Sequence, residues 1–596
     1  MNIITLDFET YFDDAYSLSK GYTTESYIRD KKFEVHGCSL KSGTGKSYWF
    51  AGEKLPDLFA QINWEAVLCH HAQFDGLILS HHYGIKPKFW FDTLSMARLL
   101  LGNHLSVGLD SLAKHFGLQA KTVPYNLFKG KHWAELPPVV QQQVADGACH
   151  DVDLTWQLFQ ILGKDFPRSE YEVVDTTIRL FTEPVLVADV PMLGEIWTSE
   201  ETNKKKNLES LGVTAKELGS NARFAELLEA EGVEPEMKEG KKGAIYAFAK
   251  TDSFMQELLE DEDERVRTLA QARLGVKSSL LQTRAETLGT MANRGALCVY
   301  LRYCGTRSTR WSGGDKTNFQ NIPPRIKPSI MAPENYLFGV IDAAQIQCRL
   351  LNYCAGQNDK VDDFRNGRDP YVGVATEFYG YEVNKNDHPE QRQVGKKLEL
   401  ACGFAAGAPK IRTMLRIAGI HVTELESVRA RDAYRKTHPA VVNYWKTASE
   451  MLNHIADGSE AEWGPMQIKD HALLLPNGLP ILHHGLEWYI DPEKKFKHGW
   501  RCKTRNGWEF QGGPKLIENA MQGLERAHIA VVTIQIKRMG YRVVGNDHDG
   551  IWVLIPKDGF QEEHLERCRE KMKIPPVWLP GIPLDADASL GQRYSK

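Results

Sequence analysis

The sequence predicts an α/β domain at the N-terminus, a helix-rich middle and an α+β region at the C-terminus. Up to about residue 165, β-like runs such as NIITLDFET and FEVHGCSL alternate with helical stretches, a pattern typical of α/β domains. From about 170 to 290 the chain is helical in pattern and strongly charged. Beyond about 295, strand-like runs such as YLFGVIDAA and GIWVLIP flank a helical region from about 360 to 455. With 596 residues, the chain is expected to form roughly two to four domains.

The composition is that of an ordinary folded protein without a membrane segment. Hydrophobic residues make up 42% of the chain and charged residues 25%. No apolar run reaches the roughly 20 residues that span a bilayer, and the start, MNIITLDFETY, lacks the basic-then-apolar pattern of a signal peptide. The ten cysteines include no C-x-x-C pair, which argues against a zinc ribbon or disulfide framework. We therefore expect a cytoplasmic protein. Its net charge of −4 means that a polyanion would have to meet local basic clusters.

Two acids near the N-terminus share one face of a predicted strand. Asp7 and Glu9 are two residues apart, so their side chains leave the strand on the same side. An exposed edge strand would tolerate this pair, but Ile3, Ile4 and Leu6 indicate a buried strand, where paired acids are costly. Two adjacent carboxylates in such a place predict a bound cation.

Two further acids also lie in apolar surroundings. Asp75 stands between Phe74 and a Gly-Leu-Ile-Leu run, and Asp151 falls on the inward stripe of a predicted helix. That stripe steps by three or four residues through Val144, Ala148, Asp151, Thr155, Leu158 and Leu162. Each acid alone is as consistent with a structural role as with a functional one. Together the four form an oxygen-rich set suited to two Mg²⁺ ions.

A second group of candidate acids lies near the C-terminus. In VVGNDHDGIWVL, Asp549 precedes a glycine between two β-like runs, which first of all predicts a hairpin turn. Asp342 falls where the buried strand LFGVID ends and a helix begins, so it is either a helix cap or a carboxylate that points into a cleft. Asp549 therefore needs partners before it can be assigned any chemistry.

A predicted helix between these acids carries an unusual stripe. Arg392, Lys396, Leu400 and Phe404 recur every four residues, and each step drifts only about 40° around a helix. Two cations followed by two apolar groups suit a ligand with a charged end and a flat end, such as a nucleoside triphosphate. Either cation alone is also consistent with a solvated face.

The four N-terminal acids resemble the set of the DEDD 3′–5′ exonuclease superfamily, and the C-terminal order D, R-x-x-x-K, H-D resembles motifs A, B and C of the family A DNA polymerases. STRWSGGDKTNFQNIP and ENAMQGLERA resemble two further segments of that polymerase family. The resemblance implies an RNase H-like exonuclease domain (1–167) followed by a right-hand polymerase. The polymerase would comprise a thumb (168–295), a palm with motif A (296–355), fingers with motif B (356–455) and the rest of the palm with motif C (456–596).

The resemblance also implies a role for each matched residue. Asp342 and Asp549, with the backbone carbonyl of Ala343, would hold two Mg²⁺ ions roughly 3.5–4 Å apart, for which Mn²⁺ can substitute. Arg392 and Lys396 would bind the incoming triphosphate. Asp7, Glu9, Asp75 and Asp151 would hold the metal ions of the exonuclease. The remaining matches would contact the nascent base pair or the primer–template: Arg310, Gln320, Asn321, Gln345, Gln347, Leu400, Phe404, Gln522 and His548.

The sequence departs from the exonuclease pattern around its acids. His71 replaces the usual Asn, and Gly147 and Asp146 stand where a Tyr or His normally orients the attacking water. His150 is a candidate substitute, although it lies on the opposite side of its helix turn. We therefore expect intact metal binding and a weakened or altered hydrolytic step.

The polymerase pattern is also altered. Ala343 replaces a Tyr, and Gln347 replaces the Glu that blocks a ribose 2′-hydroxyl, so sugar discrimination is expected to be retained but softer. Leu400 and Phe404 replace aromatic residues of motif B, and Gly550 replaces the Glu after H-D. Because both metal-binding Asp residues are intact, activity is expected to survive.

The predicted function is therefore template-directed addition of dNTPs to a primer, with proofreading. The length leaves no room for the 5′-nuclease domain of bacterial repair polymerases, so the chain resembles compact phage-encoded replicative members. We expect a monomer in the host cytoplasm that binds primer–template DNA and no membrane. A single-subunit RNA polymerase and a non-catalytic replication scaffold remain alternatives, but the DEDD set argues against the first. Two acid sets that are costly without metal argue against the second.

Overall fold

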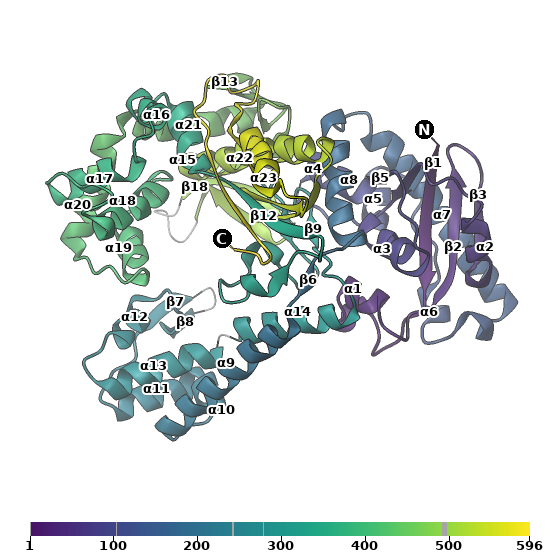
Figure 1. Ribbon diagram of the computed structural model, residues 1–596, viewed down its shortest axis with the longest axis horizontal. Coiled ribbons are helices and arrows are strands. Elements are labelled where there is room, and N and C mark those ends of the chain that lie inside the picture. Colours follow the sequence, from purple (N-terminus) through teal and green to yellow (C-terminus); the bar gives the residue numbers. More distant parts are fainter. Residues whose placement is uncertain (1, 103, 241–242, 278, 492–497, 596) are drawn as a thin grey trace.

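The protein is described by a computed structural model that covers residues 2–102, 104–240, 243–277, 279–491 and 498–595. Figure 1 shows three bodies: an N-terminal one around β1, a helical arm that carries α10 to α13, and a C-terminal one around β12. Among the described residues, no helix combines the length and the apolar character needed to cross a membrane. The predicted succession of α/β, helix-rich and α+β regions is confirmed.

The N-terminal body is a five-stranded mixed sheet with helices packed on it. Its order is β3-β2-β1-β4-β5, with β1 in the centre, antiparallel to β2 and parallel to β4. Helix α7 packs across β1, β2 and β3, so Asp151 on α7 faces the strand that carries Asp7. The elements are β1 (Ile3–Thr10), α1 (Thr24–Ile28), β2 (Val35–Ser42), β3 (Ser47–Ala51), α2 (Leu55–Phe59), β4 (Ala66–Cys69), α3 (Ala72–His82), β5 (Phe89–Asp92), α4 (Thr93–Leu101), α5 (Leu109–His115), α6 (Tyr125–Phe128) and α7 (Pro138–Leu162).

Helix α8 (Arg168–Thr182) joins the N-terminal and C-terminal bodies. It packs on β5 and α3 on one side and on the long helix α22 (Gly513–Arg538) on the other. Arg526 of α22 is buried and donates hydrogen bonds of 2.9 and 2.6 Å to Glu170, which also accepts one of 2.7 Å from Tyr303. A thumb that begins at 168 is therefore wrong at its first helix, because α8 packs in this junction and not with the arm.

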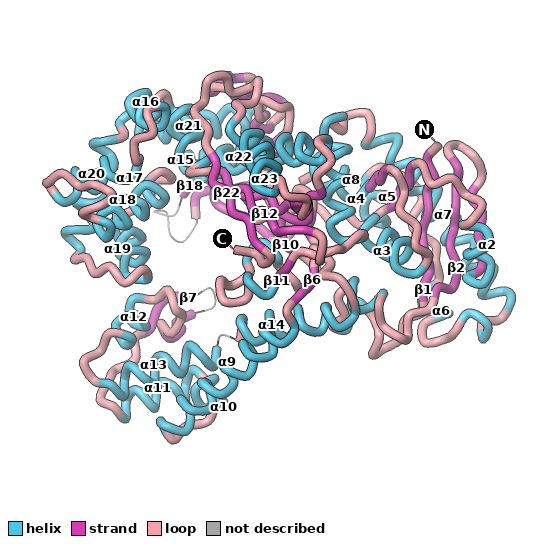
Figure 2. The backbone as a smooth tube through the Cα atoms, viewed as in Figure 1, coloured by secondary structure: helices cyan, strands magenta, loops and turns pink. Residues whose placement is uncertain are grey.

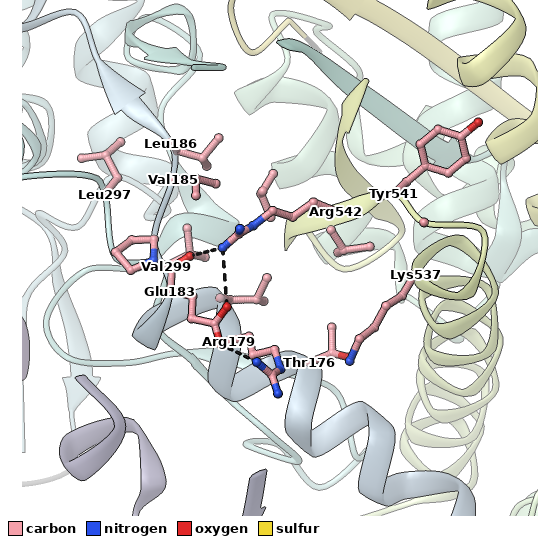
Figure 3. A pocket seen from close by; sticks show the side chains of 15 residues that line it. Thr176, Arg179, Glu183, Val185, Leu186, Leu297, Val299, Lys537, Tyr541 and Arg542 are labelled. Carbon is pink, nitrogen blue, oxygen red and sulfur yellow. Dashed lines mark hydrogen bonds and ion pairs between the residues drawn. The ribbon is translucent and has the colours of Figure 1, made fainter. Parts of the chain in front are cut away.

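A pocket of about 240 Å³ opens beside the same junction (Figure 3). Arg179 and Arg542 both reach Glu183 across it, and Lys537 lies 2.6 Å from Asp175. No sequence-predicted site residue lines this pocket. Its cations are already paired with acids, so we assign it to the packing between the two bodies.

The helical arm has its own small core. Long helices α9 and α14 lie side by side, as Figure 2 shows, and carry the remaining arm helices and a short hairpin. Phe224, Leu228, Met255 and Leu269 are among the buried residues of a core separate from that of the other bodies. The elements are α9 (Val190–Leu211), α10 (Ala215–Gly219), α11 (Asn221–Ala230), β7 (Met237–Gly240), β8 (Gly243–Tyr246), α12 (Ser253–Leu259), α13 (Glu264–Lys277) and α14 (Leu280–Arg294).

The C-terminal body is built on the antiparallel sheet β20-β21-β12-β22, whose central strand β12 lies between β21 and β22. Helix α23 packs on this sheet, and α22 packs on α23 and β20. Because β12 and β21 are paired, segments far apart in the sequence end at the same edge. The elements are β6 (Val187–Ala188), β9 (Leu301–Arg302), β10 (Ser312–Gly313), β11 (Ile330–Met331), β12 (Tyr336–Ala343), β20 (Arg542–Asn546), β21 (Gly550–Pro556), α23 (Gln561–Lys573) and β22 (Ala586–Gly591).

A helical subdomain and two small sheets complete this body. In the subdomain, α18 packs against α17, α19 and α20. Helix α18 ends at Cys402, so Phe404 lies in the following turn and not on the helical stripe expected from its spacing. The elements are α15 (Ile346–Ala355), α16 (Asn358–Arg365), α17 (Pro370–Tyr379), α18 (Pro389–Cys402), α19 (Ala408–Ile417), α20 (Glu424–Thr437), α21 (Pro439–Asp457), β13 (Ala461–Trp463), β14 (Met466–Lys469), β15 (Ala472–Leu474), β16 (Pro480–Leu482), β17 (Glu487–Ile490), β18 (His498–Thr504) and β19 (Gly507–Gln511).

Candidate active sites

The N-terminal body brings three predicted acids to one point. Carboxylate oxygens of Asp7, Glu9 and Asp151 all lie within 4.8 Å of one another, and we call these residues the N-terminal acid cluster. Asp75 is buried beside it and accepts a 3.2 Å hydrogen bond from the backbone N–H of Phe8. The two-residue spacing on β1 and the inward stripe of α7 thus place the four acids together, as the sequence indicated.

The N-terminal acid cluster has a shortage of positive charge. Burial, followed by repulsion from Asp151, raises the pKa of Asp7 to about 7 against the attraction of Lys121. Burial and repulsion from Asp7 raise the pKa values of Glu9 and Asp75 well above their ordinary range. Carboxylate oxygens that are costly to ionise together fit a divalent cation, which prefers such a donor set. The residues present therefore fit a divalent cation.

The C-terminal sheet assembles a second set of acids. Asp342 lies next to the end of β12, opposite Gly550 in the register, and the Ala343 N–H donates a 2.9 Å hydrogen bond to the backbone carbonyl of Asp549. Carboxylate oxygens of Asp342, Asp547 and Asp549 lie within 4.8 Å of one another, and we call these residues the C-terminal acid cluster. This oxygen-rich set also fits divalent cations.

Asp547 is a member that the sequence interpretation missed. It is 9% exposed and accepts a 2.8 Å hydrogen bond from the hydroxyl of Tyr594. The available signal was the spacing of Asp547 and Asp549, which repeats the two-residue spacing of the N-terminal pair. Between them His548 adopts a left-handed φ of 81° in the hairpin turn from β20 to β21. The turn predicted for Asp549 is therefore present, and it also positions the carboxylates.

The predicted cations lie on α18. Arg392 is paired with Asp369 and packs 5.1 Å from the ring centre of Tyr371. Lys396 is half-buried, and among the described residues it has no ion-pair partner. The apolar side chain of Leu400 is 48% exposed. Arg392 is thus already oriented by an acid, whereas the ammonium group of Lys396 is available to an anion.

Beside the C-terminal acid cluster lies a buried acid that the sequence interpretation did not single out. Glu525 of α22 is fully buried, and burial raises its pKa to about 7, against attraction to Arg310 and with repulsion from Asp549. Arg310 forms an ion pair with Glu525, and the nearby side chain of Gln347 also lowers the pKa of this carboxyl group. The carboxyl group of Glu525 therefore stands next to Gln347, the position where the resemblance expects a glutamate.

The other predicted contact residues are spread around this edge. Gln320 is buried and donates a 2.8 Å hydrogen bond to Asn546, which anchors the loop before the acids, while Asn321 is exposed. Gln522 accepts a 2.9 Å hydrogen bond from Ser308. Gln345, which precedes α15 with a φ of 49°, accepts a 3.0 Å hydrogen bond from Arg349.

The residues that depart from the exonuclease pattern make specific contacts in the structure. His71 lies 2.8 Å from the hydroxyl of Tyr300, which belongs to the C-terminal body. His150 donates a 3.0 Å hydrogen bond to the carbonyl of Ala120, so it is not aimed at the N-terminal acid cluster. Gly147 packs against the backbone of Val123. His150 is therefore wrong as a substitute water-orienting group.

Comparison with known proteins agrees with this arrangement. Residues 4–167 match the family model described as 3′–5′ exonuclease, and residues 194–456 match the one described as DNA polymerase family A. Fold and sites together resemble a class of protein in which a nuclease domain precedes a polymerase domain. In this chain the N-terminal part is similar to a 3′–5′ exonuclease domain, and the part that follows it is similar to DNA polymerase family A. The fold class implied by the resemblance is confirmed.

The individual relatives are distant. The chain is 22% identical to the DNA polymerase of Bacillus phage SP02 over 286 residues, which cover 46% of this chain and 43% of that one. It is 24% identical to DNA polymerase I of Pseudomonas aeruginosa over 382 residues, 59% of this chain and 40% of that one. The chain thus spans less than half the length of these relatives. The solved POL domain of Pol1 from M. smegmatis, in complex with DNA primer-template and dNTP, superposes with a TM-score of 0.66 at 17% identity and covers 100% of this chain and 95% of that one.

Proposed function

We propose that this protein is a template-directed DNA polymerase that extends a primer with dNTPs and removes 3′-terminal nucleotides with its exonuclease domain. The observation that carries the proposal is the convergence of Asp342, Asp547 and Asp549 at one edge of a sheet in a polymerase fold. A separate carboxylate set in an exonuclease domain supports the second activity.

In the polymerase site, the C-terminal acid cluster would hold two Mg²⁺ ions, with the carbonyl of Ala343 as a further ligand. Bound there, such ions lower the pKa of a primer 3′-hydroxyl and stabilise charge on the leaving pyrophosphate. Asp342 and Asp549 project from adjacent strand ends, so both can face one primer end. His548, between two of these acids, would support that end.

The helix α18 would bind the incoming nucleotide. Lys396 would bind the phosphates through its ammonium group. Arg392 would either leave Asp369 to bind a phosphate, or bind the phosphate while it stays paired with Asp369. Leu400 on the same face and Phe404 in the next turn would pack beside the nascent base pair. The cations thereby stabilise the charge that develops as the bond to the leaving phosphate breaks.

Primer–template contacts would come from the loops around the same edge. Arg310, Gln320, Asn321, Gln345 and Gln522 are the matched positions, and Arg310 is already fixed by Glu525. Between the exonuclease and polymerase domains lies a cleft of about 590 Å³ whose lining includes four arginines. They are Arg98, Arg302, Arg307 and Arg505. These arginines would bind the phosphodiester backbone of DNA. They form a local basic surface in a protein whose net charge is −4.

In the exonuclease site, Asp7, Glu9, Asp75 and Asp151 would hold Mg²⁺ against the terminal phosphodiester. The similarity to a phage polymerase supports a role in phage genome replication in the host cytoplasm, and we propose that the chain acts as a monomer. Arg and Lys residues of the helical arm would add salt-sensitive phosphate contacts, as expected of a thumb.

Primer extension tests the proposed function. A labelled primer–template is incubated with Mg²⁺ and either dNTPs or rNTPs, with wild-type protein and with Asp549→Ala. We expect template-dependent extension with dNTPs by the wild type only. Extension mainly with rNTPs would favour a single-subunit RNA polymerase, and tight primer–template binding without extension by the wild type would favour a scaffold. Omission of nucleotides measures 3′ shortening, and its absence would reject the exonuclease.

A further inference from the structure

A glycine on α7 leaves room for a neighbouring segment at the exonuclease site. A Cβ atom added to Gly147 would lie 2.8 Å from the Cα and 2.9 Å from the N of Val123. Both atoms belong to the backbone, so a side chain at 147 requires the segment before α6 to move. Helix α7 therefore cannot present a hydroxyl group from this position, one turn before Asp151.

The same segment is held against α7 by specific contacts. His150 donates a 3.0 Å hydrogen bond to the carbonyl of Ala120, and Asp110 accepts one of 3.3 Å from the N–H of Lys121. Three residues after Tyr125, Phe128 is fully buried. The segment is thus fixed at Ala120 and at Phe128, so the side chains between them have defined positions.

One side chain of this segment, Lys121, reaches the N-terminal acid cluster and contacts a second one, Tyr125. The Nζ of Lys121 lies 2.6 Å from Oδ2 of Asp151 and donates a 3.1 Å hydrogen bond to the hydroxyl of Tyr125. The Asp151 side chain is fully buried, and that of Lys121 is 25% exposed. Because Asp151 shares its cluster with Asp7 and Glu9, the ammonium group lies at the position where a cation is needed.

We propose that Lys121 is a tethered cation that takes the place of one of two divalent ions beside Asp151, and that Tyr125 supplies the hydroxyl that α7 lacks at Gly147. This inference rests on the proposed exonuclease function. The site then takes one divalent ion, held by Asp7 and Glu9. Lys121 contacts a phosphate oxygen, and the hydroxyl of Tyr125 orients the attacking water.

The charge balance supports this arrangement. An ammonium group 2.6 Å from a carboxylate oxygen occupies the same first contact that a metal ion would make, so the two compete for Asp151. Electrostatic attraction to Lys121 extends to Asp7 and Glu9. One lysine and one divalent ion together supply most of the positive charge that four buried acids require.

Metal counting tests the role of Lys121. In a background with Asp342→Asn and Asp549→Asn, Mn²⁺ bound to the protein is counted by titration with electron paramagnetic resonance or calorimetry. We expect one Mn²⁺ that Asp7→Asn removes. Lys121→Met should bind a second ion, or the first at least about tenfold more tightly, because a competing positive charge is gone. Lys121→Arg should still bind one.

The matched control is Lys129→Met, since Lys129 pairs with the exposed Asp14 in the same domain. It should leave the Mn²⁺ count and affinity unchanged. Two ions in the parent protein, or an unchanged count and affinity in Lys121→Met, would overturn the role of Lys121. The Mn²⁺ count does not depend on nuclease activity. If the parent protein shortens no DNA, the proposed exonuclease function is rejected, and the count still tests the role of Lys121.

Tyr125→Phe tests the hydroxyl separately. With single-stranded DNA, we expect kcat for 3′ shortening to fall at least about tenfold, as for loss of one positioning group, with KM and the Mn²⁺ count unchanged. Tyr48→Phe, at an exposed side chain of β3, is the control and should match the wild type. An unchanged kcat in Tyr125→Phe would overturn the role of Tyr125.

Discussion

The two acid clusters of this protein use the same sequence spacing in different backbone settings. In the N-terminal acid cluster, Asp7 and Glu9 project from one face of a strand because side chains alternate there. In the C-terminal acid cluster, Asp547 and Asp549 flank a left-handed residue in a hairpin turn, and that turn brings both to one point. The two-residue spacing therefore predicts that the two carboxylates lie close together. The local backbone, a strand or a turn, decides how they are oriented.

The clusters also differ in how their negative charge is accommodated. The N-terminal acid cluster is closed by α7 and contains a lysine from a neighbouring segment. In the C-terminal acid cluster, at the ends of β12 and β21, Asp547 accepts a hydrogen bond from a tyrosine hydroxyl. This difference teaches that a cluster covered by a helix can take a counter-charge from a loop that packs on the same helix.

Asp549→Asn should produce the largest effect. Extension should fall by about 10³-fold or more, because a lost metal ligand removes several kcal/mol of transition-state stabilisation. The 3′ shortening of single-stranded DNA should be unchanged, since the exonuclease cluster is separate. Single-turnover extension and shortening are measured in parallel. If both activities fall together, the two clusters are not independent sites.

Glu170→Ala should break the junction on which the spacing of the two clusters depends. It leaves the fully buried Arg526 without its carboxylate, which costs about 3–5 kcal/mol. Thermal unfolding should begin at lower temperature, and Glu172→Ala, which removes an exposed pair with Arg538, is the control with little effect. Equal midpoints for the two variants would mean that the buried pair does not hold the bodies together.

The stability of the metal-free exonuclease domain should fall as pH rises. The pKa of Asp7 is about 7 in the folded protein and near 3.8 in the unfolded chain, so the folded state binds more protons between these values. Stability is therefore lost from about pH 4 to 7, by about 1.4 kcal/mol per unit of pKa shift. In EDTA, Asp7→Asn should unfold at a higher temperature than the wild type at pH 8, and at the same temperature as the wild type at pH 4. A constant difference would contradict the raised pKa, and Mg²⁺ should reduce the gain.

Gln347→Glu should have the smallest effect. It adds a charge next to Glu525, and we expect selection of dNTPs over rNTPs to sharpen by about tenfold, or about 1.4 kcal/mol. Competing incorporation of a dNTP and its rNTP measures this ratio. Equal incorporation of both by the wild type would refute the retained discrimination that we predict for Gln347.

Local patterns in the sequence predicted the parts of the sites that local geometry controls. The alternation on β1, the helical stripe through Asp151 and the Asp-Gly turn at 549 all depend on neighbouring residues. The position of Phe404 was predicted wrongly because the four-residue spacing was continued past Cys402. Helix α18 ends there, and the chain turns over the next three residues, of which Ala405 has a left-handed φ of 57°.

What the sequence could not predict depends on contacts between distant segments. Lys121 reaches Asp151, and contacts Tyr125, because the loop before α6 packs on Gly147. Glu525 stands beside Gln347 because α22 packs on α15. Neither contact leaves a periodic signal in one sequence. Packing between elements therefore supplies these residues.

The central claim is that two acid clusters act on the same DNA end with opposite chemistry, and idling turnover tests it in one measurement. Protein, primer–template, Mg²⁺ and only the next correct dNTP, labelled at its α-phosphate, are mixed, and the release of labelled dNMP is followed. The wild type should convert dNTP to dNMP continuously, because each added nucleotide is removed again. Asp549→Asn and Asp7→Asn should each abolish the release. A wild type that releases no dNMP, or a release that survives in either variant, would contradict the account.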